Sequence, residues 1–195
     1  MSDETSTKIS DADLAKSLQA RKALIVHFSH HSTMSAKIVF PNDLLYAIQN
    51  SDPWPLSCCV VWPGHTMDLP GSVGIILNPS APQVVSVRNN DSGSFTCADG
   101  QDVSSGVPLD PNSLNETFLP VGPYNEWRVA YGAPIVGIFV SDRTPLRAKQ
   151  WVRVRVGERY EEHISAEQIF IPSIFDAFPD MSFYTFHAGA KRRLK

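Results

Sequence analysis

Short runs of apolar residues, separated by segments rich in proline, glycine and asparagine, make up most of the hydrophobic pattern along the chain. Such runs, bounded by turn-forming residues, predict buried β-strands. The strands expected from this pattern lie at 24–28, 58–62, 73–77, 84–87, 127–131, 135–140, 151–156 and 182–186. The run at 151–156 alternates strictly, so its valines share one face while Trp151, Arg153 and Arg155 share the other.

Apolar residues at helical spacing predict only a few short helices. Ser10 or Asp11 could cap a helix that runs through about Gln19, with Leu14 and Leu18 on its buried side. Further short helices are expected at 41–49, 165–171 and 173–178. Because strands outnumber helices and do not alternate regularly with them, the pattern predicts an α+β fold with a twisted, mixed or antiparallel sheet.

Two connections between these elements stand out. The turn Gly132-Ala133-Pro134 predicts a hairpin between the strands at 127–131 and 135–140. The segment 89–111 is polar and nearly free of apolar residues, which predicts a long loop. Loops of that length in a compact domain are often functional or disordered.

Composition fits one globular domain. The chain has 195 residues, 43% of them hydrophobic, which is enough to bury a core. We expect a disordered lead-in at 1–10, a single domain at 11–188 and a basic tail at 189–195. The start of the chain lacks the apolar segment of a secretory signal, and no apolar run approaches the roughly twenty residues that span a bilayer. A cytoplasmic protein without a membrane partner is expected.

Charge is unevenly distributed around a net value of −3. Cationic residues gather between 143 and 159 and again at 191–195. These clusters are either solvated surface or a patch for phosphate-bearing partners.

Three of the six histidines lie within or just after the strand expected at 24–28. Strand alternation would put His27, Ser29 and His31 on one face and His30 on the other. A histidine at the end of an apolar strand can hold a polar ligand, or it can be a hydrogen-bonded residue leaving the core. Because the cluster is divided between two faces and lacks zinc-site spacing, no metal ligands are assigned.

A carboxylate opens the strand expected at 127–131. Glu126 follows the tight turn at Gly122 and Pro123, so its backbone would be fixed while its side chain reaches a neighbouring cleft. Such a carboxylate can stabilise a developing cation or orient a nucleophile. The alternative is an ordinary surface ion pair with Arg128, which shares its strand face.

Arg88 stands where the strand expected at 84–87 runs into a polar, glycine-containing loop. Backbone N–H groups of this loop could cradle phosphate oxygens, with Arg88 adding a charge-assisted contact. A flexible hairpin end is the alternative. The chain contains no P-loop, no G-x-G-x-x-G and no G-x-S-x-G motif, which disfavours the nucleotide and hydrolase folds that carry them.

Two of these stretches carry a family resemblance. HFSH at 27–30 resembles the opening of DarT-type and related bacterial members of the ADP-ribosyltransferase superfamily, and YNEWRV at 124–129 is similar to the late strand that holds that family's catalytic glutamate. Family members bind NAD in a cleft of a split, mixed sheet. The resemblance implies that His27 and Ser29 hold NAD while Glu126 stabilises an oxocarbenium-like transition state.

The resemblance also implies an aromatic residue that stacks on nicotinamide, for which Tyr46 and Trp62 compete, and Arg88 joins the expected NAD contacts. Tyr124 stands two residues before Glu126, where arginine-modifying toxins carry Glu or Gln. That departure leaves nucleic acid or another molecule open as the acceptor.

The function expected is therefore NAD-dependent ADP-ribosyl transfer, by a bacterial toxin or phage-defence effector, to a nucleic-acid or protein acceptor. Arg153 and Arg155 would contact a nucleic acid, and a cognate antitoxin or inhibitor is a further expected partner. One alternative is a nuclease that uses His27, His30 or His31 as acid and base. Another is a non-catalytic module that binds a partner.

Overall fold

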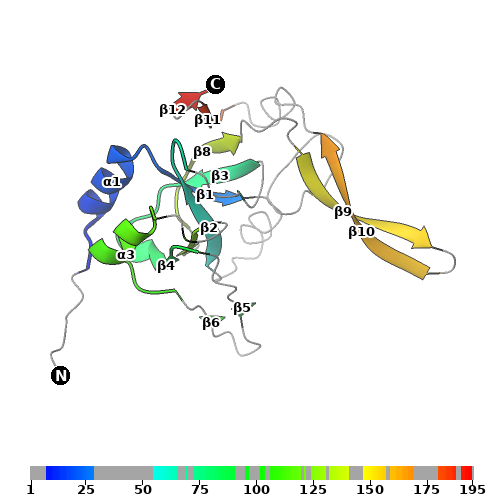
Figure 1. The fold of residues 1–195 in the computed structure, drawn as a ribbon, viewed down its shortest axis with the longest axis horizontal. Coiled ribbons are helices and arrows are strands. Elements are labelled where there is room, and N and C mark those ends of the chain that lie inside the picture. The colour runs from blue at the N-terminus through cyan, green and yellow to red at the C-terminus, as the bar shows by residue number, and fades with distance from the viewer. Residues whose placement is uncertain are drawn as a thin grey trace.

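The computed structural model describes most of the central domain (Figure 1). The described residues are 8–28, 55–65, 69, 73–90, 95–96, 102–103, 106–119, 121, 124–130, 132–140, 147–156, 159–168, 180–187 and 190–194.

Within these residues, eight strands form one open sheet. In order across the sheet they are β12 (Ala190–Arg193), β11 (Phe183–His187), β8 (Ile135–Val140), β3 (Val73–Leu77), β1 (Leu24–Phe28), β2 (Leu56–Val61), β7 (Glu126–Val129) and β4 (Val84–Arg88). Neighbouring strands are antiparallel except β11 and β8, which are parallel. With few short helices beside a mixed sheet, the α+β prediction is confirmed.

Two antiparallel strand pairs lie outside this sheet. One joins β9 (Arg147–Val156) to β10 (Arg159–Gln168), and the other joins β5 (Phe95–Thr96) to β6 (Asp102–Val103). The strand predicted at 151–156 is thus the second half of β9.

Strand β2 divides the main sheet into two halves. Its residues Cys59–Val61 pair with β1, whereas Leu56–Cys58 pair with β7. The β1–β2 ladder ends at the pair Val26 and Cys59, while β1 goes on pairing with β3 as far as Phe28. The two half-sheets therefore part beside the C-terminal end of β1, at a place we call the split.

Two helices, α1 (Asp11–Ala20) and α3 (Pro111–Glu116), lie on the same side of the sheet (Figure 1). Leu14 of α1 and Leu114 of α3 are buried against the strands there. We call this side the helix-covered face. Its buried strand residues are Ile25, Leu56, Cys58, Val60, Ile75, Leu77, Val84, Val87, Trp127 and Val129.

The other side of the sheet holds a second apolar cluster, which is centred on β1, β3 and β8. Phe28 and Phe139 contact each other edge to face, with ring centroids 5.8 Å apart. The buried members of this cluster are Val26, Phe28, Cys59, Val61, Ile76, Phe139 and Phe186.

The predicted first helix is confirmed, because α1 begins after an N-cap at Ser10. The Ser10 hydroxyl accepts a hydrogen bond from the Asp13 backbone N–H over 3.1 Å. Asp11 then ties the helix to the short 3₁₀ helix η1 (Ala81–Gln83), because its carboxylate accepts from the Ala81 N–H over 2.6 Å. No helix among the described residues has the length and apolar character needed to cross a membrane.

The prediction of a hairpin between 127–131 and 135–140 is wrong. Both strands form, but β7 pairs with β2 and β4, and β8 pairs with β3 and β11. Gly132 adopts a positive φ of 89°, which lets the chain turn there without closing a hairpin. Long-range strand pairing has overridden the local turn signal.

Three other expectations need correction. Residues 165–168, expected to begin a helix, belong to β10, where the register with β9 continues through Gln168. The loop expected at 89–111 contains β5 and β6 and ends at α3. Most of the expected basic tail forms β12, which pairs with β11 as the edge strand of the sheet. The helices expected at 41–49 and 173–178, and most of the lead-in at 1–10, lie outside the described residues.

Candidate active site at the split

Glu126 is the first residue of β7 and lies between the two strands that flank β7 in the sheet. Its neighbours in the sequence fix its position. The fully buried Asn125 side chain bonds the backbone of β2: its Oδ1 accepts from Val60 N over 2.7 Å and its Nδ2 donates to Val60 O over 2.8 Å. On the other side, Trp127 Nε1 donates to Thr117 Oγ1 over 3.0 Å. Glu126 is held between two anchored residues.

The Glu126 carboxylate is 6% exposed and receives two described contacts at one oxygen. The Ser57 hydroxyl donates to Oε1 over 2.6 Å, and Arg128 Nε lies 3.1 Å from the same atom. The expected alternative for Glu126, an ion pair with Arg128, is thus present, but it is not on the surface, since Arg128 is only 14% exposed. A buried carboxylate needs such donors, because burial without them costs several kcal/mol.

Arg88 lies directly opposite Glu126 in the β4–β7 ladder. Paired residues of antiparallel strands present their side chains on the same face, about 5 Å apart at Cβ. The same rule places Ser57 and Ser86 beside Arg128. We call this row of Ser57, Ser86, Arg88, Glu126 and Arg128 the polar strip. It lies on the side of β2, β7 and β4 away from the helix-covered face, and it carries two guanidinium groups for one carboxylate.

His27 lies at the split, buried to 2% exposure. Its Nδ1 is 2.7 Å from the backbone oxygen of Ser57, just past the last β1–β2 ladder pair. Since a carbonyl oxygen only accepts hydrogen bonds, Nδ1 carries the proton in this contact. The imidazole therefore continues the connection between β1 and β2 where backbone pairing has stopped.

His27 and Glu126 contact the same residue through different groups. The imidazole bonds the Ser57 carbonyl oxygen, and the carboxylate bonds the Ser57 hydroxyl. Strand alternation puts His27 on the side of Ile25, the helix-covered face, and Glu126 on the side opposite Trp127. The two candidate residues thus meet at the split from opposite sides of the sheet.

Sequence reasoning missed Ser57 and Asn125, which organise this site. Ser57 is the one polar residue of the strand LSCCVV. A single polar position in an apolar strand was the signal that could have selected it. Asn125 precedes the candidate glutamate directly, and a buried Asn side chain in that position can replace backbone pairing, as it does opposite Val60.

Trp62, a candidate for stacking on nicotinamide, is not brought to Glu126. It follows β2 at the end remote from Ser57, five residues away, which is about 17 Å of extended strand. Its ring contacts Phe118 and His65, with centroids 5.2 and 5.3 Å apart. The other stacking candidate, Tyr46, lies outside the described residues.

Ser29, His30 and His31 also lie outside the described residues. Arg153 and Arg155 belong to β9, where the register places them opposite Glu162 and Tyr160 of β10.

The buried thiols of β2 are poor nucleophiles. Burial raises the pKa of the Cys59 thiol to about 12, against a smaller lowering by a backbone hydrogen bond from Asn125. Cys58 is buried as well. Among the described residues, no group of three or more His, Cys, Asp or Glu side chains could hold a metal ion.

No protein-family model matches the chain, and neither a curated protein nor a solved structure does. A functional conclusion therefore depends on the arrangement of these side chains.

Proposed function

We propose that the protein is an NAD-dependent ADP-ribosyltransferase of the toxin or phage-defence kind, and that NAD binds at the split along the polar strip. The observation that carries the proposal is the convergence of His27 and Glu126 on Ser57. The three residues come from three neighbouring strands and from distant parts of the sequence, separated by 30 and 69 residues. The resemblance implies a split, mixed sheet with a histidine and a glutamate beside the split. Here Glu126 faces the polar strip, and His27, on the other face, would act through Ser57.

The charge of the polar strip supports the same proposal. Arg88 offers guanidinium donors suited to the diphosphate of a dinucleotide. Among the described residues, Arg88 makes no ion pair within 4.0 Å, although Glu126 lies opposite it in the ladder. Arg128 is bound to Glu126 and would serve mainly to hold that carboxylate in place.

In the proposed reaction the bond between ribose C1′ and the nicotinamide nitrogen breaks, and its electron pair leaves with nicotinamide. Positive charge develops on the ribosyl carbon and ring oxygen. The Glu126 carboxylate, oriented by the Ser57 hydroxyl and Arg128, would stabilise that charge. Because the carboxylate is already held in place, little free energy would be lost in reorienting it during the reaction. The acceptor then attacks C1′ and loses a proton.

The test is transfer of label from NAD carrying radioactive phosphate in the adenylate half, offered with mixed protein, RNA and DNA acceptors. We expect labelled acceptor and stoichiometric nicotinamide from the natural chain, and loss of both in Glu126→Gln with the unfolding transition preserved. Glu116→Gln, at an exposed position of α3, is the matched control and should retain full transfer. Full transfer by Glu126→Gln would refute the assignment of that residue.

The two alternative functions, a nuclease and a non-catalytic binding module, require different things of His27 and Glu126. A nuclease needs a histidine that exchanges protons with its substrate, whereas His27 is buried and its Nδ1 is engaged by Ser57. A non-catalytic module would tolerate loss of both His27 and Glu126. Absence of NAD binding and nicotinamide release by the purified chain would favour these alternatives.

A further inference from the structure

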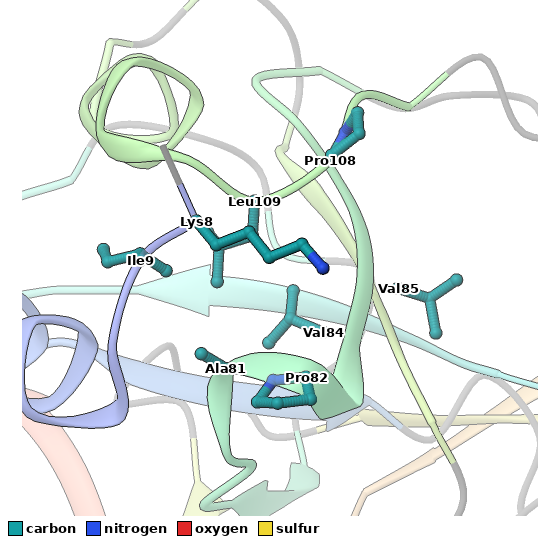
Figure 2. Close-up of a pocket in the computed structure, with 8 residues that line it drawn as sticks. All are labelled: Lys8, Ile9, Ala81, Pro82, Val84, Val85, Pro108 and Leu109. Atoms are coloured by element: carbon teal, nitrogen blue, oxygen red, sulfur yellow. The ribbon is translucent and has the colours of Figure 1, made fainter. Parts of the chain in front are cut away.

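A pocket of about 310 Å³ opens beside the first half of β4, on the helix-covered side of the sheet (Figure 2). It shares no residue with the polar strip. Eight residues line it: Lys8, Ile9, Ala81, Pro82, Val84, Val85, Pro108 and Leu109. Seven of these are apolar, and the volume is at the lower end of the range for small-molecule sites.

The floor of the pocket is part of the core. Ala81, Val84 and Leu109 are buried members of the larger apolar cluster. Its rim is exposed, and Val85 keeps half of its surface in solvent. An apolar molecule seated there would cover exposed rim side chains and extend the core outward.

Hydrogen bonds fix both walls. Behind Ala81 and Pro82, the Gln83 side-chain oxygen accepts from the backbone N–H and the hydroxyl of Ser80 over 2.9 and 3.2 Å. Behind Pro108, the Ser113 hydroxyl donates to the Pro108 carbonyl over 2.9 Å. Because these contacts and the two proline rings restrain the backbone, binding loses little conformational entropy.

Lys8 supplies the one charged group of the lining. Figure 2 shows its side chain lying across the pocket, with the ammonium nitrogen toward β4. No carboxylate of the described residues forms an ion pair with it. The carboxylate of nearby Asp11 is engaged by the Ala81 N–H over 2.6 Å. The pocket thus combines an apolar interior with a cation at its mouth.

We propose that this pocket binds a small amphiphilic carboxylate, with its apolar tail over Ala81, Val84 and Leu109 and its head group at the Lys8 ammonium. A volume of 310 Å³ suits on the order of ten non-hydrogen atoms. This inference does not depend on the proposed transferase activity.

The probe is sodium octanoate, titrated into the full ¹³C-labelled chain and followed by methyl NMR, with 1-octanol as the uncharged comparator. Octanoate should shift the methyl signals of Val84, Val85 and Leu109 saturably. It should bind about three- to fivefold more tightly than octanol, the increment of one partly exposed ion pair.

Lys8→Met keeps the aliphatic stem and removes the charge, so it should abolish the preference for octanoate while octanol binding stays unchanged. Lys16→Met, at an exposed position of α1, is the matched control and should keep the preference. Shifts that do not saturate, or that centre on other methyl groups, would overturn the pocket assignment. An octanoate preference that survives Lys8→Met would overturn the role of the charge.

Discussion

The hydroxyl of Ser57 donates a hydrogen bond of 2.6 Å to Oε1 of Glu126, across the 69 residues that separate them in the chain. This bond makes Ser57 part of the carboxylate's environment, and the Ser57 carbonyl oxygen makes it part of the environment of His27 as well.

Replacing Ser57 by alanine should destabilise the fold and impair the site. The substitution removes a donor from a carboxylate that is 6% exposed, so we expect a loss of about 1–3 kcal/mol in the free energy of unfolding. Urea denaturation of both chains would measure this change in the free energy of unfolding. Among the described residues the Ser182 hydroxyl is bonded only to exposed Arg193, so Ser182→Ala should change stability by less than about 0.5 kcal/mol. Equal effects of the two substitutions would contradict the importance given to the Ser57 bond.

Asn125→Ala should loosen the start of β7. It leaves the N–H and the carbonyl of fully buried Val60 without the side chain that satisfies them, which we expect to cost about 2–4 kcal/mol. Amide hydrogen exchange should show faster exchange at Val60. Asn115→Ala is the control, because among the described residues the exposed Asn115 side chain only accepts from partly buried Arg21. Unchanged protection at Val60 would show that Asn125 does not anchor the strand.

Gly74→Ala should disturb the strand that carries His27. A Cβ atom at position 74 would collide with the Val26 side chain and lie 2.7 Å from the His27 carbonyl oxygen. Overpacking of this kind costs about 1–3 kcal/mol. In a Val26→Ala background, Gly74→Ala should cost less but still destabilise, because the collision with the His27 carbonyl oxygen remains. If Gly74→Ala had no effect on thermal unfolding in that background, the backbone collision would be ruled out.

The thiol of Cys59 should be unreactive in the native protein. Burial disfavours the thiolate and raises the pKa from 9.0 to about 12, so at pH 8 hardly any nucleophile is present. In a Cys97→Ser chain, iodoacetamide should leave Cys59 unmodified until denaturant is added, as mass spectrometry of its peptide can show. Rapid native labelling would contradict its burial.

The raised pKa of the Cys59 thiol also makes the stability of the fold depend on pH. The unfolded chain loses the Cys59 proton near pH 9, before the folded chain does, so the stabilisation is complete below pH 9 and is lost as the pH rises toward 12. Cys59→Ala should remove this part of the alkaline decline in the free energy of unfolding.

The elements that could be predicted from sequence are those with a strong local signal. The runs at 24–28, 73–77 and 135–140 form strands with the expected bounds, because short, buried apolar segments have few other stable arrangements. Which strands pair with each other in the sheet could not be predicted in the same way. The turn at Gly132 indicated a hairpin, yet burial of Trp127 and Val129 against α3 and β2 decides where β7 lies.

For the site, the sequence singled out His27, Arg88 and Glu126 by residue type and by their places at strand ends. A lone serine in an apolar strand could have drawn attention to Ser57, but its role could not be predicted, because that role depends on which strands lie beside it. The same limit applies to β12, whose cationic residues look like a solvated tail until β11 is available to pair with them.

Because β1 and β7 pair with different halves of β2, the two half-sheets are offset along β2 and form a step. Residues Leu56–Cys58 serve one half and Cys59–Val61 the other, so the two halves are displaced along β2 by three residues, about 10 Å. Because β2 pairs with both halves, a twist of one half against the other would act on β2 near Ser57. A molecule bound in this step would contact the end of the β1–β2 ladder and the beginning of the β2–β7 ladder. It would therefore restrain the two half-sheets relative to each other. Its binding should therefore slow amide exchange in β3 and β4 together, although these strands lie on opposite sides of the step.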